Sequence, residues 1–348
     1  FNKFKNIDVD NIYGLTDELN TLFILKYYKK TKRNILILTS SVYQANKYYK
    51  KMKTYTKNVF FFPMDDFLTS VAVSTSPEFK AQRLQTINNI NNNQPCIIIT
   101  NLMGFLKYIP NKNDFDKSII NLEEKMIIKR NKLIEVLDYI GYQKESLVTS
   151  TGEYSVRGFI IDVFPFNYDN PIRIEFFGDE IESIREFNYD TQLSTKKLNE
   201  IKILPYKEII SKNYSSIYDY LDDPVVFKID NELINNSYKH LQEEIFNYKT
   251  INKIDSNYKY MFYLDEILVK KSINMNNIGL NKANSISYSS QAIEYFNGNI
   301  KLLKNFVMSK INKNTIIFMT TNEKLISKIV KLFDNNICLD KISKNKIN

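Results

Sequence analysis

The sequence contains few residues that bind soft metals or form disulfides. Among its 348 residues are two cysteines, Cys96 and Cys338, which lie far apart, and one histidine, His240. A structural zinc site needs several Cys or His ligands at close spacing. The composition therefore excludes a zinc centre, and unpaired cysteines are typical of a protein of the reducing cytoplasm.

Long apolar runs are also absent. No stretch approaches the roughly 20 consecutive apolar residues that cross a bilayer, and residues 1–4 do not begin a signal peptide. We therefore expect a cytoplasmic protein. With 43% hydrophobic and 25% charged residues, a chain of this length is predicted to fold into several domains.

Arginine is scarce, although the formal net charge is +9. The lysines are scattered along the chain among many Asn, Ile and Tyr residues, so we discount the charge as an indication of nucleic-acid binding. Only six of the 48 basic residues are arginines, and three of these are Arg157, Arg173 and Arg185. Because a guanidinium binds carboxylates through two hydrogen bonds, this local use of Arg indicates either a binding surface or structural salt bridges.

Residues 1–118 alternate short apolar runs with helical patterns, which is typical of an α/β domain with a parallel sheet. Three runs without polar alternation predict strands buried on both faces, at 35–38, 59–62 and 96–99. Helices are predicted between them, at 17–29, 41–52 and 77–90.

Residues 119–208 have a different pattern. A short amphipathic helix ends at Gly141, and the period then changes from helical to two. Residues 156–164 and 172–187 are predicted as antiparallel strands, the second broken by a turn at Gly178. These features predict a small α+β domain inserted after the first sheet.

The rest of the chain has weaker patterns. Residues 209–290 contain a strand pattern at 225–227 and a long helical pattern at 231–247, and we expect them to complete the first domain. Residues 291–348 show helix, strand (315–319) and helix, which predict the start of a further small α/β domain.

One segment has the spacing of a phosphate-binding loop. In the P-loop pattern G-x-x-x-x-G-K-[ST], glycines let backbone N–H groups surround phosphates, and the Lys reaches the β and γ oxygens. The sequence has Gly14 and Thr21 at the ends of this spacing, but Leu19 replaces the second Gly and Asn20 replaces the Lys. Leu disfavours positive φ and Asn carries no charge, so we predict a degenerate P-loop that does not bind nucleotide. Alternatively, the spacing is a coincidence and the segment is an ordinary helix start with Thr16 as N-cap.

Acidic residues are predicted to have local structural roles rather than catalytic ones. Asp17 and Glu18 suit the positive end of a helix dipole but repel phosphate, and Thr16 before them is a candidate N-cap. Asp65 and Asp66 point apart on an extended chain, so a loop or helix-cap role is expected instead of a metal site. We predict no catalytic residue and no metal site.

A family resemblance lies in the antiparallel region. Residues 152–165 (GEYSVRGFIIDVFP) and 171–185 (PIRIEFFGDEIESIR) resemble the UvrA-binding domain shared by UvrB and the bacterial transcription-repair coupling factor (Mfd). Upstream, residues 39–45 (TSSVYQA), 62–66 (FPMDD) and 76–78 (SPE) are also similar to that family. The resemblance implies a helicase-like domain with a degenerate P-loop, interrupted by a UvrA-binding domain.

Two departures favour the coupling factor over UvrB. UvrB has an intact P-loop and a long, Tyr-rich β-hairpin after the strand that corresponds to 59–62. Here only fourteen residues separate Phe62 from Pro77, and Phe67 is the one aromatic among them. The resemblance implies an adaptor that recruits UvrA to stalled RNA polymerase for transcription-coupled nucleotide excision repair.

Other activities of that family belong to domains that lie further downstream in its members. They comprise binding of RNA polymerase and an ATP- and magnesium-dependent motor that moves on double-stranded DNA, and no match to either lies in this sequence. We therefore expect no cofactor and no enzymatic activity in these 348 residues.

The resemblance implies UvrA contacts at Arg157, Arg173 and Phe177. Along 172–177 alternate side chains face opposite ways, so Arg173 and Phe177 share the face opposite the apolar set. We expect both side chains to be free of the core. An exposed Phe beside an Arg is a frequent pairing at protein interfaces.

Alternatives remain for the site and for the function. Arg185 is a weaker candidate contact, and a salt bridge to Glu182 or Glu186 is the favoured interpretation; Phe177 is alternatively buried under a neighbouring loop. The function is alternatively that of a UvrB-like, ATP-dependent subunit that loads on damaged DNA, or of a direct nucleic-acid-binding module. A nucleotide titration and the salt dependence of DNA affinity distinguish these classes.

Overall fold

The computed structural model describes residues 9–66, 76–90, 94–210, 213–277, 284–290, 296–311, 316, 318 and 322–333. The chain divides into two compact units, residues 1–290 and 291–348. Within the described ranges, no helix is long and apolar enough to cross a membrane.

The first unit is built on a parallel sheet of seven strands in the order β17-β1-β16-β15-β2-β4-β3. The strands are β1 (Asn11–Tyr13), β2 (Ile35–Thr39), β3 (Val59–Phe62), β4 (Ile97–Asn101), β15 (Val225–Ile229), β16 (Lys271–Asn276) and β17 (Ser285–Ser287). Strands β2 and β4 are buried along their full length, as expected for apolar strands that are covered on both faces. The predicted α/β class with a parallel sheet is confirmed.

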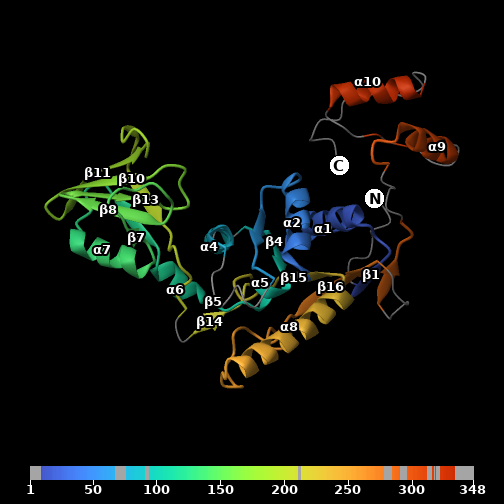
Figure 1. Cartoon of the computed structure of the whole chain (residues 1–348), viewed down its shortest axis with the longest axis horizontal. Helices are drawn as coiled ribbons and strands as arrows, with labels where there is room; N and C mark the ends of the chain where they lie inside the picture. Colours follow the sequence, from blue (N-terminus) through green and yellow to red (C-terminus); the bar gives the residue numbers. More distant parts are fainter. Residues whose placement is uncertain are drawn as a thin grey trace. The chain divides into compact units, whose positions relative to one another are not determined.

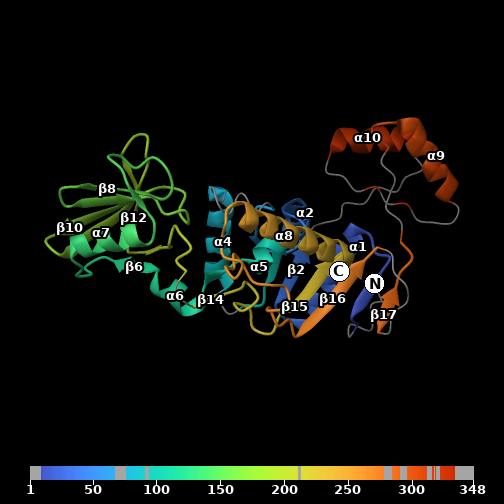
Figure 2. The same cartoon turned by 60° about the horizontal axis from the view of Figure 1, so that its bottom comes forward.

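Helices cover both faces of this sheet (Figure 1). On one face lie α1 (Asp17–Thr31) and α2 (Val42–Lys53); on the other lie α4 (Pro77–Ile90), α5 (Leu102–Leu106) and α8 (Asn231–Ile251). Figure 2 shows α8 lying across β15 and β16. Polar side chains cap the N-termini of α1 and α2. The Thr16 hydroxyl accepts a hydrogen bond from the backbone N–H of Leu19, and the Ser41 hydroxyl accepts one from that of Gln44.

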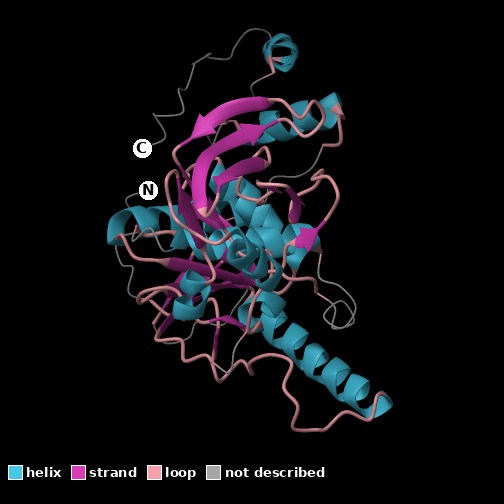
Figure 3. Ribbon diagram, turned by 90° about the vertical axis from the view of Figure 1, so that its left-hand side faces the viewer, coloured by secondary structure: helices cyan, strands magenta, loops and turns pink. Residues whose placement is uncertain are grey.

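The region 120–209 interrupts the parallel sheet with mostly antiparallel structure (Figure 3, magenta strands). Its main sheet has the order β12-β11-β10-β9-β8-β7, and a second ladder pairs β13 with β6. The elements are β6 (Ile120–Glu123), α7 (Arg130–Tyr139), β7 (Gln143–Lys144), β8 (Glu153–Arg157), β9 (Ile160–Val163), β10 (Ile172–Phe177), β11 (Glu180–Phe187), β12 (Ser194–Leu198) and β13 (Glu200–Ile203). Apolar residues of α7, of the ladder and of one face of the main sheet form a single core.

The structure corrects one predicted strand in this region. Residues 156–164 are not continuous, because β8 ends at Arg157 and β9 begins at Ile160. Gly158 occupies the intervening turn with φ +60°, a conformation that glycine adopts without steric cost. The two short strands therefore form a hairpin.

The chain segments that lead into and out of the antiparallel region lie side by side. Strand β5 (Ile109–Pro110), followed by α6 (Lys112–Lys117), enters the region, and β14 (Tyr214–Ser215) leaves it. β5 and β14 pair antiparallel. The inserted region is therefore attached to the parallel-sheet domain through two adjacent segments.

A buried ion cluster lies beside this attachment. The fully buried Arg83 of α4 donates from Nε and Nη2 to the carboxylate of Glu208, at 2.7 and 3.2 Å, and Lys107 Nζ lies 3.1 Å from the same carboxylate. Burial alone would raise the pKa of Glu208, but the two cations hold that pKa below its ordinary value. The cluster thus joins the end of the antiparallel region to the parallel-sheet domain.

The second unit contains α9 (Ile300–Lys310) and α10 (Glu323–Leu332). These agree with the two helices predicted after residue 291. The predicted strand at 315–319 falls outside the described residues except at 316 and 318.

Candidate protein-binding surface and degenerate phosphate loop

The side chains of β10 alternate between the two faces of the antiparallel sheet, as predicted. The apolar set on one face is buried in the core, and it consists of Ile172, Ile174 and Phe176. Arg173 and Phe177 share the opposite face, which we call the outer face. By strand register this face also carries Arg157 of β8, Asp162 of β9 and Glu175 of β10.

Asp162 lies at the centre of the outer face. Its side chain is 1% exposed and accepts hydrogen bonds from Arg157 Nη2 at 2.7 Å and from Arg173 Nε and Nη2 at 2.8 and 2.9 Å. Two arginines therefore share one buried carboxylate. Because charge-assisted bonds of this kind fix the plane of a guanidinium, Asp162 sets the direction of both side chains.

Arg173 is more enclosed than the sequence predicted. Its side chain is 15% exposed, its guanidinium carbon lies 4.3 Å from the centroid of the Phe187 ring, and it donates to the backbone and side-chain oxygens of Gln192. The hydrogen bond to Asp162 raises the pKa of Arg173 above its ordinary value. Arg173 lies on the face opposite the apolar set, as expected, but it has structural contacts with Asp162, Phe187 and Gln192 that the sequence did not predict.

Arg157 and Arg185 differ in how far their guanidinium groups are free to contact another protein. The Arg157 side chain is 47% exposed, so part of its guanidinium faces solvent. Arg185 forms a salt bridge, as favoured, but its partner is Glu175 rather than Glu182 or Glu186. Glu175 lies diagonally across on the neighbouring strand β10, on the same face as Arg185, which explains the difference.

Phe177 is open to solvent. It is 78% exposed at the last position of β10, just before Gly178, which has φ +64° in the turn to β11. The alternative interpretation, burial under a neighbouring loop, is wrong. An exposed aromatic ring and the half-exposed Arg157 thus lie on one face at the same end of the sheet.

A second exposed aromatic residue, Phe159, was missed by the sequence reasoning. It is 65% exposed in the β8–β9 turn, and its carbonyl oxygen accepts a hydrogen bond from the N–H of Phe176 at 2.9 Å. The sequence reasoning placed Phe159 inside a continuous strand. Gly158 is the one local signal that could have indicated the turn.

The P-loop-like segment forms the start of a helix. Strand β1 ends at Tyr13 and α1 begins at Asp17, so three residues connect them. Gly14 has φ +73°, and a Cβ at this position would overlap the backbone carbonyl of Tyr288. The segment after β17 therefore lies directly against the turn, with the Tyr288 N–H donating to the Tyr13 carbonyl at 2.9 Å.

Asn20 and Thr21 are buried inside α1. Asn20 Nδ2 donates to the Tyr48 hydroxyl at 3.3 Å, and the Thr21 hydroxyl donates to the Asp17 carbonyl at 2.9 Å. Both side chains at the positions of the P-loop Lys and Ser/Thr thus have partners within the protein.

The two carboxylates of the first turn of α1 pair with lysines of α2. Lys47 Nζ lies 2.6 Å from Asp17, and Lys51 donates to Glu18. The hydrogen bond from Lys51 lowers the pKa of Glu18 below its ordinary value. The helix N-terminus is therefore occupied by acidic side chains of the chain itself.

Asp65 and Asp66 have the predicted structural roles. Both carboxylate oxygens of Asp66 accept from the backbone N–H of Val42, at 2.9 Å, at the start of α2, and Asn101 Nδ2 donates to the same carboxylate at 2.6 Å. Asp65 accepts from the backbone N–H of Ser76. In the part of the chain that the structure describes, no three His, Cys, Asp or Glu side chains gather closely enough to hold a metal ion.

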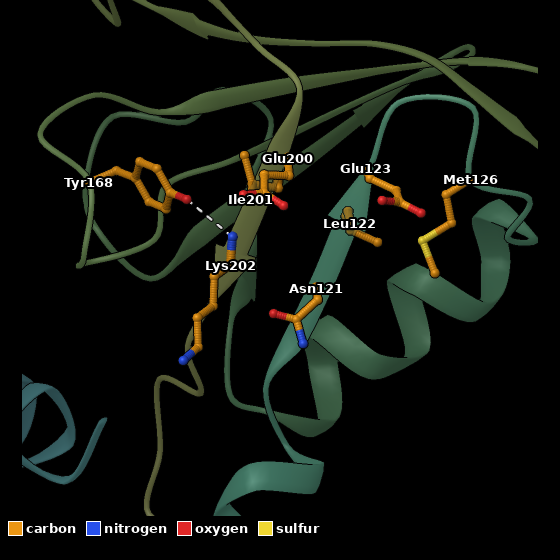
Figure 4. Close-up of a pocket in the computed structure, with 8 residues that line it drawn as sticks. All are labelled: Asn121, Leu122, Glu123, Met126, Tyr168, Glu200, Ile201 and Lys202. Carbon is orange, nitrogen blue, oxygen red and sulfur yellow. Dashed lines mark hydrogen bonds between the residues drawn. The ribbon is translucent and has the colours of Figure 1, made fainter. Parts of the chain in front are cut away.

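A hollow of about 540 Å³ lies beside the β6–β13 ladder (Figure 4). Within it, Glu123 and Glu200 stand opposite each other in register, and the Tyr168 hydroxyl accepts from the backbone N–H of Lys202 at 3.1 Å. A pair of surface carboxylates does not define a catalytic centre. We therefore assign no function to this hollow.

Comparison with known proteins agrees with this architecture. Residues 120–209 match the family described as UvrB interaction domain. The chain is 32% identical over 199 residues to the transcription-repair-coupling factor of Bacillus subtilis strain 168, which is 57% of this chain and 17% of the relative. It is 28% identical over 240 residues to that of Staphylococcus epidermidis strain RP62A, which is 67% of this chain and 20% of the relative.

The fold and the matched region define a UvrB interaction domain inserted into a parallel-sheet α/β domain. This domain lies within an N-terminal region homologous to transcription-repair-coupling factor. The aligned residues span about a fifth or less of the relatives' length.

Proposed function

We propose that this chain recruits UvrA through the outer face of its UvrB interaction domain. The observation that carries the proposal is that the exposed Phe177 and the half-exposed Arg157, whose direction is fixed by the buried Asp162, lie on one face at the same end of the sheet. Aromatic and arginine side chains held on a rigid element are the residues that dominate binding energy at interfaces.

In a larger parent protein, this contact serves transcription-coupled nucleotide excision repair. Domains outside these residues engage RNA polymerase and double-stranded DNA, and the present region brings UvrA to the stalled polymerase. The homology to transcription-repair-coupling factor supports this assignment.

The same proposal includes no nucleotide hydrolysis in this chain. A phosphate-binding loop needs free backbone N–H groups and a lysine, whereas here Asn20 and Thr21 are buried and Asp17 and Glu18 occupy the helix start. These contacts disfavour the alternative of a UvrB-like ATPase.

The test is a calorimetric titration of the chain with purified UvrA. Phe177→Ala and Arg157→Ala are each expected to weaken binding by at least about 2 kcal/mol, which is roughly 30-fold. Phe246→Ala is the matched control, because Phe246 is 69% exposed on α8, outside the UvrB interaction domain. Unchanged affinity in both test variants, with the wild-type fold retained, would refute the proposed surface.

A further inference from the structure

Three chain segments lie side by side at one end of the antiparallel sheet. They are the β8–β9 turn, the β10–β11 turn and the segment 125–128 before α7. The Phe176 N–H donates to the Phe159 carbonyl at 2.9 Å, which joins the first turn to the end of β10, next to the second turn. The Ile128 N–H donates to the Asp179 carbonyl at 2.8 Å, which joins the second turn to the third segment.

Each segment exposes a large apolar side chain. Phe159 is 65% exposed, and Phe177 and Ile127 are each 78% exposed. Single exposed apolar residues are ordinary, but a group on adjacent segments marks an interaction site in soluble proteins. We call this group the turn-end surface.

The backbone conformation of the turns does not explain why these exposed positions carry apolar side chains. The turns need glycine at Gly158 and Gly178, where φ is positive, but nothing lies within 4 Å of a Cβ built at either position. The space around both turns is therefore open, and the high exposure of Phe159 and Ile127 agrees with this. The apolar choice at Phe159 and Ile127 calls for a partner outside the chain.

Two arginines frame the turn-end surface. Arg130 donates from Nη1 to the Gly158 carbonyl, and its guanidinium carbon lies 6.0 Å from the centroid of the Phe159 ring. On the other side of the same turn, the half-exposed Arg157 is held by Asp162. A complementary surface presents apolar side chains flanked by carboxylates.

We propose that Phe159 and Ile127 join Phe177 in a single docking surface for the repair partner. This inference rests on the proposed function, since the occupant is the same UvrA surface that contacts Phe177 and Arg157. It is broader than the strand face on which Arg157, Arg173 and Phe177 lie, because it includes a second turn and the segment that precedes α7. The partner face is therefore an apolar area with carboxylates opposite Arg130 and Arg157 and none opposite Glu180, which stands between Phe177 and Ile127 in register.

The experiment measures UvrA affinity of the full chain by calorimetry, together with its thermal unfolding. Phe159→Ala and Ile127→Ala are each expected to weaken binding about tenfold, as for the residues around an interface hot spot, with unfolding unchanged. Leu193→Ala is the matched control, because Leu193 is 68% exposed in the β11–β12 loop at the opposite end of the same sheet. Its affinity is expected to stay within about twofold of the wild type, since it lies outside the proposed contact.

The outcomes separate this inference from the proposed function. If Phe177→Ala weakens binding but Phe159→Ala and Ile127→Ala do not, the broader surface is refuted and the UvrA contact stands. If neither these three variants nor Arg157→Ala changes the affinity, both proposals fail. Phe159→Leu, which keeps apolar bulk, is expected to retain most of the affinity lost in Phe159→Ala; equal losses in both would show that apolar contact is not what Phe159 provides.

Discussion

Removing the guanidinium of Arg173 is expected to destabilise the antiparallel region. In Arg173→Ala, the carboxylate of Asp162, which is 1% exposed in the wild type, keeps only the single bond from Arg157, at 2.7 Å. Breaking a buried ion pair by removing one partner costs about 3–5 kcal/mol. The lower end, about 3 kcal/mol, applies here because Arg157 remains and water can enter where the partly exposed Arg173 was.

Phe177→Ala provides the contrast. The ring is 78% exposed, so its removal is expected to change the free energy of unfolding by no more than about 0.5 kcal/mol. The two residues share one strand face, yet one supports the fold and the other does not.

The assay is urea-induced unfolding combined with hydrogen exchange of the amides of β9 and β10. The informative control is the double variant Asp162→Ala/Arg173→Ala, in which no carboxylate is left buried without its partner. Because replacing both partners of a buried polar pair costs far less than orphaning one, the double variant is expected to be more stable than Arg173→Ala alone. A single variant as stable as the wild type, or a double variant no more stable than the single one, would refute the reasoning.

Three further outcomes are expected. Calorimetry should detect no ATP binding in the wild type, and Leu19→Gly with Asn20→Lys should not restore it, because position 20 is buried in α1; micromolar affinity in either protein would contradict this. Residues 1–118 alone should lack a cooperative urea transition, since they contain four of the seven parallel strands; a sharp transition would show an independent domain. Glu208→Gln should destabilise the chain by about 3 kcal/mol at pH 7, because it leaves Arg83 buried without a carboxylate. The pKa of Glu208 is lowered in the folded protein, so the stability that its carboxylate provides is complete above the ordinary Glu pKa and is lost as the pH falls through the folded pKa. The wild type is therefore expected to lose more stability in acid than Glu208→Gln does. Equal acid sensitivity of the two proteins would refute the ion-cluster role.

The fold class was predictable because its central strands are apolar throughout. Strands β2 and β4 lie between covering helices, and burial on both faces leaves a continuous apolar run in the sequence. Strand β16 was missed because only Ile273 and Met275 are buried and polar residues alternate with them. Strand β1 has three residues, too few for a periodic pattern.

The candidate site was predictable only where local alternation decides it. Phe177 follows from the period of β10, and its exposure agrees. The enclosure of Arg173 does not follow, because Gln192 and Phe187 approach it from other parts of the chain. Phe159 was hidden for a different reason, since both sides of the β8–β9 turn have strand-like composition.

Neighbouring strands of the parallel sheet are far apart in the sequence, which has a consequence for synthesis on the ribosome. The loop before β2 meets the loop before β15 through Arg33 and Asp223, which are 190 residues apart in the sequence. At about 5–20 residues per second, roughly 10 to 40 s separate the translation of these two strands. Throughout that interval β2 has no neighbour on one edge, and its unpaired backbone groups are open to pairing with another chain.

The antiparallel region is translated within the same interval and has mostly local hairpin contacts, which form fast. The antiparallel region can therefore be complete on the nascent chain before the parallel sheet that carries it has closed. A chaperone that covers the free edge of β2 during this time would raise the yield of folded protein. Synonymous codons that slow translation between residues 101 and 225 would lower that yield.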